Sequence, residues 1–234
     1  MSSSQERYEK RMVLQPGAAE VSKSTYNAII GGVLLYGFIA DAIIVALFKN
    51  KAIEMILNNP GGYSTTLIVM MVIYAICCFA GSFMVNRSDN PVVSFIGFNL
   101  FAIPIGFVLA YGTIPFYNGG SVAIAFALTA VITLAMLVIS TIFPDTFLSM
   151  GTTLFISLLV CVIVDLLALL IFKSDLIFID YIVTFIFSLF IGYDWARANR
   201  CAKTIDNAVD CAAELYLDMI NLFIRILSIV GRRD

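Results

Sequence analysis

Seven long apolar stretches, separated by short polar turns, dominate the chain. Each is close to the roughly 20 residues that a helix needs to cross the hydrocarbon core of a membrane. Turns rich in Asn, Gly and Pro connect several of them, for example Asn58–Gly62 and Asn118–Gly120. The pattern predicts an all-α integral membrane protein, a seven-transmembrane helix bundle, with spans at Thr25–Phe48, Thr65–Val85, Val92–Ile114, Val122–Phe143, Thr152–Phe172, Leu176–Asp194 and Ala208–Val230.

The connections between these stretches leave no room for a separate soluble domain. We therefore predict a polar N-terminal tail over residues 1–24 and a single seven-helix transmembrane domain over residues 25–234. A cleavable signal peptide is not expected, because the first apolar run begins late and is too long for a signal-peptide core.

The last apolar stretch differs from the others because it carries acidic residues at a regular spacing. Asp210, Glu214 and Asp218 recur every four residues, and Asn221 and Arg225 continue the same line. On a helix these five positions fall within roughly 80° of one another around the axis. Such a polar seam requires water, ions or protein partners beside it. It predicts either an ion pathway or a packing surface, and an amphipathic helix lying on the membrane surface is a third interpretation.

Composition excludes several classes of protein. The chain is 61% hydrophobic and 13% charged, which is far too apolar for a soluble domain of 234 residues. The net charge of −2 and the lack of a basic region argue against a nucleic-acid partner. Histidine is absent, so proton sensing near neutral pH must rely on carboxylates. Five cysteines indicate no disulfide framework, since most lie within spans: Cys77, Cys78, Cys161, Cys201 and Cys211.

The distribution of Lys and Arg predicts that the N-terminus is cytoplasmic and the C-terminus lies outside. In that orientation eight basic residues lie on the inner side, namely Arg7, Lys10, Arg11, Lys23, Arg87, Arg197, Arg200 and Lys203. Five lie on the outer side, namely Lys49, Lys51, Lys173, Arg232 and Arg233.

Other polar and small residues within the spans have two interpretations each. Three aspartates are predicted either to line an outer mouth or to be paired structurally: Asp41, Asp165 and Asp180. Three glycines of the first span predict close helix packing: Gly31, Gly32 and Gly37.

Enzyme motifs are missing from the sequence. There is no Walker loop, no dinucleotide-binding fingerprint and no nucleophile elbow. Tyr193-Asp194 and Asp218 are similar to the paired aspartates of intramembrane proteases, which use a Gly-x-Gly-Asp motif. Here Leu215–Asp218 has no glycine to admit a substrate backbone. We therefore predict that the protein is not an enzyme.

Two motifs carry a resemblance to a known family. Tyr193-Asp194, followed by Glu214–Phe223 in the last span, closely resembles the C-terminal signature of the Bax inhibitor-1 (transmembrane Bax-inhibitor-motif) family, in its prokaryotic type. Pro144–Gly151 is similar to the loop before that family's fifth span. Trp195-Ala196-Arg197 departs from the Thr-Gln usually found after the first aspartate, which puts the local hydrogen bonding in question.

The resemblance implies a pH-sensitive calcium leak in the plasma membrane of a prokaryote. It implies a seventh helix wrapped by the other six, and a pair of aspartates, Asp194 and Asp218, that share a proton, act as the pH sensor and hold calcium transiently. It also implies a closed-state latch, for which Arg87 is the candidate, although Arg87 can equally be read as an ordinary inside-positive anchor. Calcium is then the transported species, and no cofactor is expected.

The residues themselves are consistent with this function. Two carboxylates in one dry site cannot both ionise cheaply, so they titrate as a pair. Asp210, Glu214 and Asn221 offer oxygen ligands, which calcium prefers, and are candidates for an ion pathway. The expected partners are lipid, calcium and protons. Two alternatives stay open: a non-conducting membrane protein that modulates a partner complex such as a protease or channel, and proton-coupled secondary transport.

The predicted topology can be tested with a reporter that is active only outside the cytoplasm. Fused after Asp234 it should be active, and inserted between Arg200 and Lys203 it should be inactive, because the basic residues favour the inner side. The measurement is reporter activity in intact cells. The opposite pattern would place Asp194 at the outer face.

Overall fold

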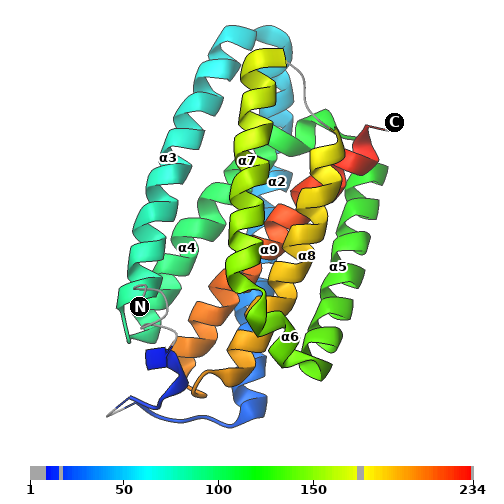
Figure 1. The fold of residues 1–234 in the computed structure, drawn as a ribbon. Coiled ribbons are helices and arrows are strands. Elements are labelled where there is room, and N and C mark those ends of the chain that lie inside the picture. Colours follow the sequence, from blue (N-terminus) through cyan, green and yellow to red (C-terminus); the bar gives the residue numbers. More distant parts are fainter. Residues whose placement is uncertain (1–8, 16–17, 173–176, 233–234) are drawn as a thin grey trace. The chain divides into compact units, whose positions relative to one another are not determined.

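The computed structural model describes residues 9–15, 18–172 and 177–232, and it is helical (Figure 1). Arg7, Lys173 and Arg233, which were counted for topology, lie outside the described residues, as does Leu176 at the start of the sixth predicted span. The helices are α2 (Lys23–Asn58), α3 (Pro60–Arg87), α4 (Pro91–Val108), α5 (Gly119–Ile142), α6 (Pro144–Ser149), α7 (Gly151–Phe172), α8 (Ile177–Arg200) and α9 (Ile205–Gly231). The all-α class is confirmed.

Helix boundaries follow the Asn and Pro signals in the turns. Asn59 and Asn90 cap α3 and α4 through their side-chain oxygens, and a proline occupies the first turn of each helix, where its missing N–H costs nothing. Asn118 caps α5 by accepting from the Ser121 N–H at 2.8 Å. The turn predicted at Pro144-Asp145 is instead the short helix α6.

Each of the seven predicted stretches forms a helix, but membrane crossing is supported for six. Within the described residues, the helices that are long and apolar enough to span are α2, α3, α4 with its extension to Thr113, α5, α7 and α8. α9 is not one of them, and it carries Asp210, Glu214, Asp218 and Arg225. The count of seven spans is therefore not confirmed, and the orientation across the membrane stays a prediction.

The chain divides into two compact units. The first comprises Met1–Phe116 and Arg200–Tyr216, and the second comprises Tyr117–Asn199 and Leu217–Asp234. α9 thus contributes its first part to one unit and its remainder to the other. The prediction of a single transmembrane domain stays a prediction.

In the first unit, α3 and α4 pack at close range. A Cβ on Gly81 would lie 2.7 Å from the carbonyl oxygen of Gly97, so only glycine permits this approach. After Val108, α4 continues as a wider π-helical turn, Leu109–Thr113. A short 3-10 turn, Ile114–Phe116, follows it. Such a turn disturbs the regular hydrogen-bond ladder. The Tyr63 hydroxyl donates to the Tyr111 carbonyl at 2.7 Å and stabilises the turn.

The glycines of α2 have different environments. A Cβ on Gly37 would lie 2.8 Å from the Phe98 ring, so the prediction of close packing is confirmed at this position. Among the described residues, no neighbouring atom lies within 4 Å of such a Cβ on Gly31 or Gly32, so the prediction of close packing is wrong at these two positions. Spacing alone did not show that these two residues lie on an open face of the helix.

The second unit contains α5 to α8 and the last part of α9. The Trp195 indole N–H of α8 donates to the Thr141 hydroxyl of α5 at 2.9 Å. In both units large apolar side chains are exposed, for example Phe79 at 80% and Phe178 at 74%. A soluble protein rarely exposes apolar surface on this scale, whereas lipid solvates it without cost.

We expect Gly81→Ala to destabilise the protein by about 1–3 kcal/mol, because the added methyl group collides with the backbone of Gly97. The measurement is the thermal unfolding temperature of purified protein in detergent. Gly32→Ala is the matched control, and it should leave that temperature unchanged because its Cβ meets open space. Equal effects of the two substitutions would contradict the close contact of α3 and α4.

Candidate functional site

The acidic seam lies on one continuous helix, α9. The helix starts after Thr204, whose hydroxyl caps it by accepting from the Asn207 N–H at 3.2 Å. Helical geometry then places Asp210, Glu214 and Asp218 on one side, four residues apart. Asp210 is 1% exposed and Asp218 9% exposed, so two of the three carboxylates are removed from bulk solvent.

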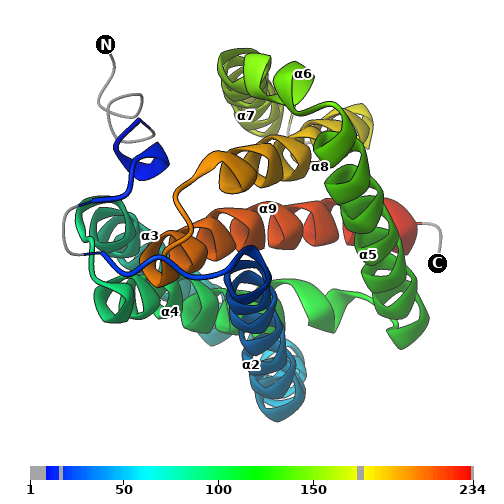
Figure 2. The same cartoon turned by 90° about the horizontal axis from the view of Figure 1, so that it is seen from below.

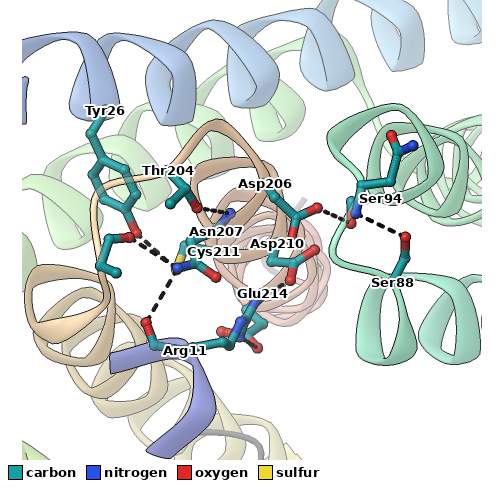
Figure 3. A network of polar contacts seen from close by, with 12 residues as sticks. Arg11, Tyr26, Ser88, Ser94, Thr204, Asp206, Asn207, Asp210, Cys211 and Glu214 are labelled. Atoms are coloured by element: carbon teal, nitrogen blue, oxygen red, sulfur yellow. Dashed lines mark hydrogen bonds and ion pairs between the residues drawn. The ribbon is translucent and has the colours of Figure 1, made fainter. Parts of the chain in front are cut away.

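Arg11 neutralises the first part of this seam (Figure 3). Its guanidinium lies 2.7 Å from an Asp210 carboxylate oxygen and 2.8 Å from a Glu214 oxygen. Arg11 itself is only 7% exposed. Burial opposes its charge, but the carboxylates of Glu214 and Asp210 outweigh burial and raise the pKa of Arg11 well above its ordinary value. Arg11 is therefore a permanent cation on the seam.

Arg11 belongs to the N-terminal strap, defined here as residues 9–15 and 18–21, which precedes α2 in the chain (Figure 2). The Arg11 carbonyl accepts from the Ala202 N–H at 2.8 Å and from the Asn207 side-chain amide at 3.2 Å. Farther along, the Val21 N–H donates to the Lys203 carbonyl at 2.7 Å. The strap is thus tied by its backbone to the loop before α9.

Sequence reasoning counted Arg11 only as an inner-side charge and did not place it at the seam. Arg11 is separated from Glu214 by 203 positions, so the sequence carried only a weak signal that these two side chains meet. A seam of acids in an apolar helix does require a cation, and the N-terminal tail, which is mixed in charge, was one source of such a cation.

The two predicted sensor residues both belong to the second unit. Asp194, on α8, is buried, as is Asp218. The Arg197 guanidinium lies 3.5 Å from an Asp194 oxygen and stacks over the Tyr193 ring at 5.4 Å. Arg197 was not among the predicted site residues. The departure from the family pattern at Trp195-Ala196-Arg197 therefore places a cation beside Asp194.

Parts of the two motifs that carry the family resemblance lie against each other in the second unit, where Tyr193 meets Gly151. Gly192 has no room for a side chain because the Phe147 ring of α6 fills that space. Gly151, at the start of α7, lies against Tyr193, whose ring would be 2.6 Å from a Cβ there. Helix α6 and the end of α8 thus form one structural element around Asp194.

The remaining predicted site residues have local contacts. The Asn221 side-chain amide donates to the Leu217 carbonyl of its own helix at 2.7 Å. Arg87 is exposed at the end of α3, with its guanidinium 4.6 Å from the centre of the Phe83 ring. Arg87 belongs to the first unit and the two aspartates to the second, so the latch stays a prediction.

Arg225, the last member of the seam, is part of a charged cluster in the second unit. Its guanidinium lies 2.6 Å from Asp180 and 3.5 Å from Asp165. Arg232 lies 3.0 Å from Asp180, and the Ser228 hydroxyl donates to the same carboxylate at 3.0 Å. These contacts favour structural pairing of Asp165 and Asp180 over an open outer mouth.

Asp41, the third of these aspartates, is paired within the first unit. It is buried on α2 and accepts a hydrogen bond of 2.5 Å from the Tyr216 hydroxyl of α9. The Tyr216 ring packs edge-on against Phe98 of α4, with 5.2 Å between ring centres. Together these contacts fix the first part of α9 against α2 and α4.

Comparison with known proteins places the chain in a family. The family described as "Inhibitor of apoptosis-promoting Bax1" (Bax1-I) matches residues 18–234. The chain belongs to the Bax1-I family. The resemblance drawn from the motifs around Tyr193, Asp218 and Pro144 is thereby confirmed.

Relatives of this Bax1-I protein are bacterial. An uncharacterized membrane protein of Streptococcus pyogenes serotype M3 is 27% identical over 216 residues, covering 89% of this chain and 91% of the relative. A protein of Borreliella burgdorferi is 26% identical over 223 residues, covering 90% and 93%. A protein of Helicobacter pylori is 40% identical over 86 residues, 36% of each chain. No solved structure matches the chain.

Among the residues that the structure describes, no group of three or more His, Cys, Asp or Glu could hold a metal ion. Transient calcium at Asp194 and Asp218 therefore stays a prediction about a transported ion.

We expect Asp180→Asn to destabilise this Bax1-I protein by about 2–3 kcal/mol, because it leaves Arg225 and Arg232 without their closest carboxylate. Asp165→Asn is the control and should cost under about 1 kcal/mol, since Asp165 is 34% exposed and 3.5 Å from Arg225. Both are measured as thermal unfolding temperatures in detergent. If Asp165→Asn lowered the unfolding temperature more than Asp180→Asn, then Asp165 and not Asp180 would be the main carboxylate partner in this cluster.

Proposed function

We propose that this Bax1-I protein is a passive, pH-sensitive leak that lets cations, including calcium, cross the membrane. The observation that carries the proposal is the burial of Asp210 and Asp218 on one face of α9, in a chain whose other helices expose apolar side chains. Acidic residues in such surroundings are costly and are typical of ion pathways. Family membership supports a membrane function of this kind.

The chemistry of the seam favours a hard cation. Carboxylate oxygens of Asp210, Glu214 and Asp218 repeat along about 12 Å of helix at 1.5 Å per residue. Calcium prefers several oxygen ligands at once, and ligands spaced along a path favour passage over tight storage. Preference for calcium over monovalent ions is part of the proposal, and charge density supports it.

Asp194 and Asp218 supply the pH response in this proposal. Both are buried in the same unit, and the chain contains no histidine that could titrate instead. Arg197 forms an ion pair with Asp194, with 3.5 Å between the guanidinium and a carboxylate oxygen. Uptake of a proton would remove the charge that holds Arg197 and allow the end of α8 to rearrange. Arg87 is kept as the proposed latch of the closed form.

A second candidate function is a non-conducting membrane protein that modulates a partner complex. This candidate is favoured because polar groups of the seam are paired within the protein. Arg11 forms ion pairs with Asp210 and Glu214. The Asn221 amide donates a hydrogen bond to a carbonyl of its own helix. In that case the acids only shape helix packing. A modulator alone carries no ions when purified, whereas a proton-coupled transporter would move calcium against its gradient.

The test is calcium flux through purified protein in liposomes between about pH 5 and 8. The wild type should conduct with a pH-dependent rate. Asp194→Asn and Asp218→Asn should each shift or flatten the pH transition, because Asn resembles protonated Asp but cannot ionise. The double substitution should be little worse than either single one, since a shared proton is one functional unit.

Glu54→Gln is the control for these flux measurements, because Glu54 is exposed on α2 and belongs to none of the contacts above. Its pH profile should match the wild type. Absence of flux in the wild type at every pH would reject the leak and favour the modulator. Normal pH profiles in both single variants would end the sensor assignment even if the protein conducts.

A further inference from the structure

The N-terminal strap covers the part of the α9 seam that is nearest the helix start (Figure 3). Asp210 and Arg11 are 1% and 7% exposed, so their ion pair excludes water almost completely. The next carboxylate along the seam, that of Glu214, accepts a hydrogen bond from the other terminal nitrogen of the same guanidinium. One side chain from the strap therefore occupies the place where a cation would contact both acids.

The strap is attached by contacts that can open without unfolding a helix. Besides the Arg11 ion pairs and the two hydrogen bonds to the Arg11 carbonyl, its attachment includes the β-bridge between Glu20 and Thr204, of which the Val21–Lys203 hydrogen bond is part. The Lys10–Asp89 ion pair is exposed and contributes little. Short backbone pairings of this kind lie at the low-stability end of a structure and open locally.

A cleft of about 240 Å³ runs beside the strap. Lys10 and Arg11 line it on the strap, and Thr204 to Asn207 line it at the start of α9. Arg11 thus borders an open cleft on the strap side as well as the seam.

We propose that the N-terminal strap is an autoinhibitory plug, in which the Arg11 guanidinium substitutes for a cation between Asp210 and Glu214 and denies ions access to the seam. Release of the strap would remove the guanidinium from both carboxylates, and their negative charges would then favour a cation in its place. That the strap blocks ion flow rests on the proposed leak function. That the strap covers Asp210 and Glu214 does not depend on that function.

The covering is tested by chemical labelling of carboxyl groups on purified protein, with a water-soluble carbodiimide and an amine, read out by mass spectrometry. Wild-type Asp210 and Glu214 should be labelled far less than the exposed Glu54. Arg11→Gln removes the charge but keeps a polar side chain, and it should raise labelling of both carboxylates at least about fivefold. Lys10→Gln, in the same segment, is the matched control and should change neither.

Calcium flux in liposomes gives the second readout for the same three proteins. Arg11→Gln should conduct at least about fivefold faster than the wild type, and Lys10→Gln should conduct as the wild type does. If labelling rises in Arg11→Gln while no protein conducts at any pH, the covering stands and the leak function fails. If the wild type conducts and Arg11→Gln does not conduct faster, the plug is overturned.

A cleavable variant keeps the test valid if Arg11→Gln does not fold. A protease site is inserted between Gln15 and Ala18, and the folded protein is cut, washed in high salt, and labelled before and after cutting. Higher labelling of Asp210 and Glu214 after cutting supports the plug. Labelling of these two residues that already equals Glu54 before cutting overturns it.

Discussion

The cost of placing a carboxylate in an apolar helical protein governs the polar architecture of this molecule. An ionised acid away from water is tolerated only beside a cation or a strong hydrogen-bond donor. Asp210 and Glu214 have Arg11, Asp180 has Arg225 and Arg232, Asp194 has Arg197, and Asp41 has the Tyr216 hydroxyl. Each of these partners also fixes an element: the strap, the end of α9, the end of α8, and the contact of α9 with α2.

α9 is the helix on which these pairings depend most. Its first part belongs to one compact unit and its last part to the other, and it carries polar contacts in both. In the first unit the cation comes from the N-terminal strap, which is held by a few backbone hydrogen bonds. In the second unit Asp180 of α8 is paired with Arg225 of α9 and with Arg232, which directly follows that helix. The cation of the first unit thus comes from a segment far away in the sequence, whereas that of the second comes from α9 or its end.

Packing in the second unit explains part of the Bax1-I signature. Phe147 of α6 fills the space beside Gly192, and Tyr193 lies against Gly151, so the motif before α7 holds the end of α8 in place. Asp194 follows directly, with Arg197 one turn later. A change of charge at Asp194 is thus next to a tightly packed joint between helices, where a small rearrangement affects several elements.

The sequence by itself determined the long helices and the spacing of acids along α9, although α2 runs on to Asn58 and α6 stands where a turn was predicted. These features depend on local signals, namely runs of apolar residues, Asn and Pro in turns, and a four-residue repeat. The family could also be recognised from contiguous motifs. Only the tertiary structure decided which cation meets which acid, for example that Asp165 and Asp180 both form ion pairs with Arg225. It also decided that Gly37 is closely packed while Gly32 lies on an open face of its helix. Arg11 and Glu214 are 203 positions apart, and no periodicity along the chain relates residues that only folding brings together.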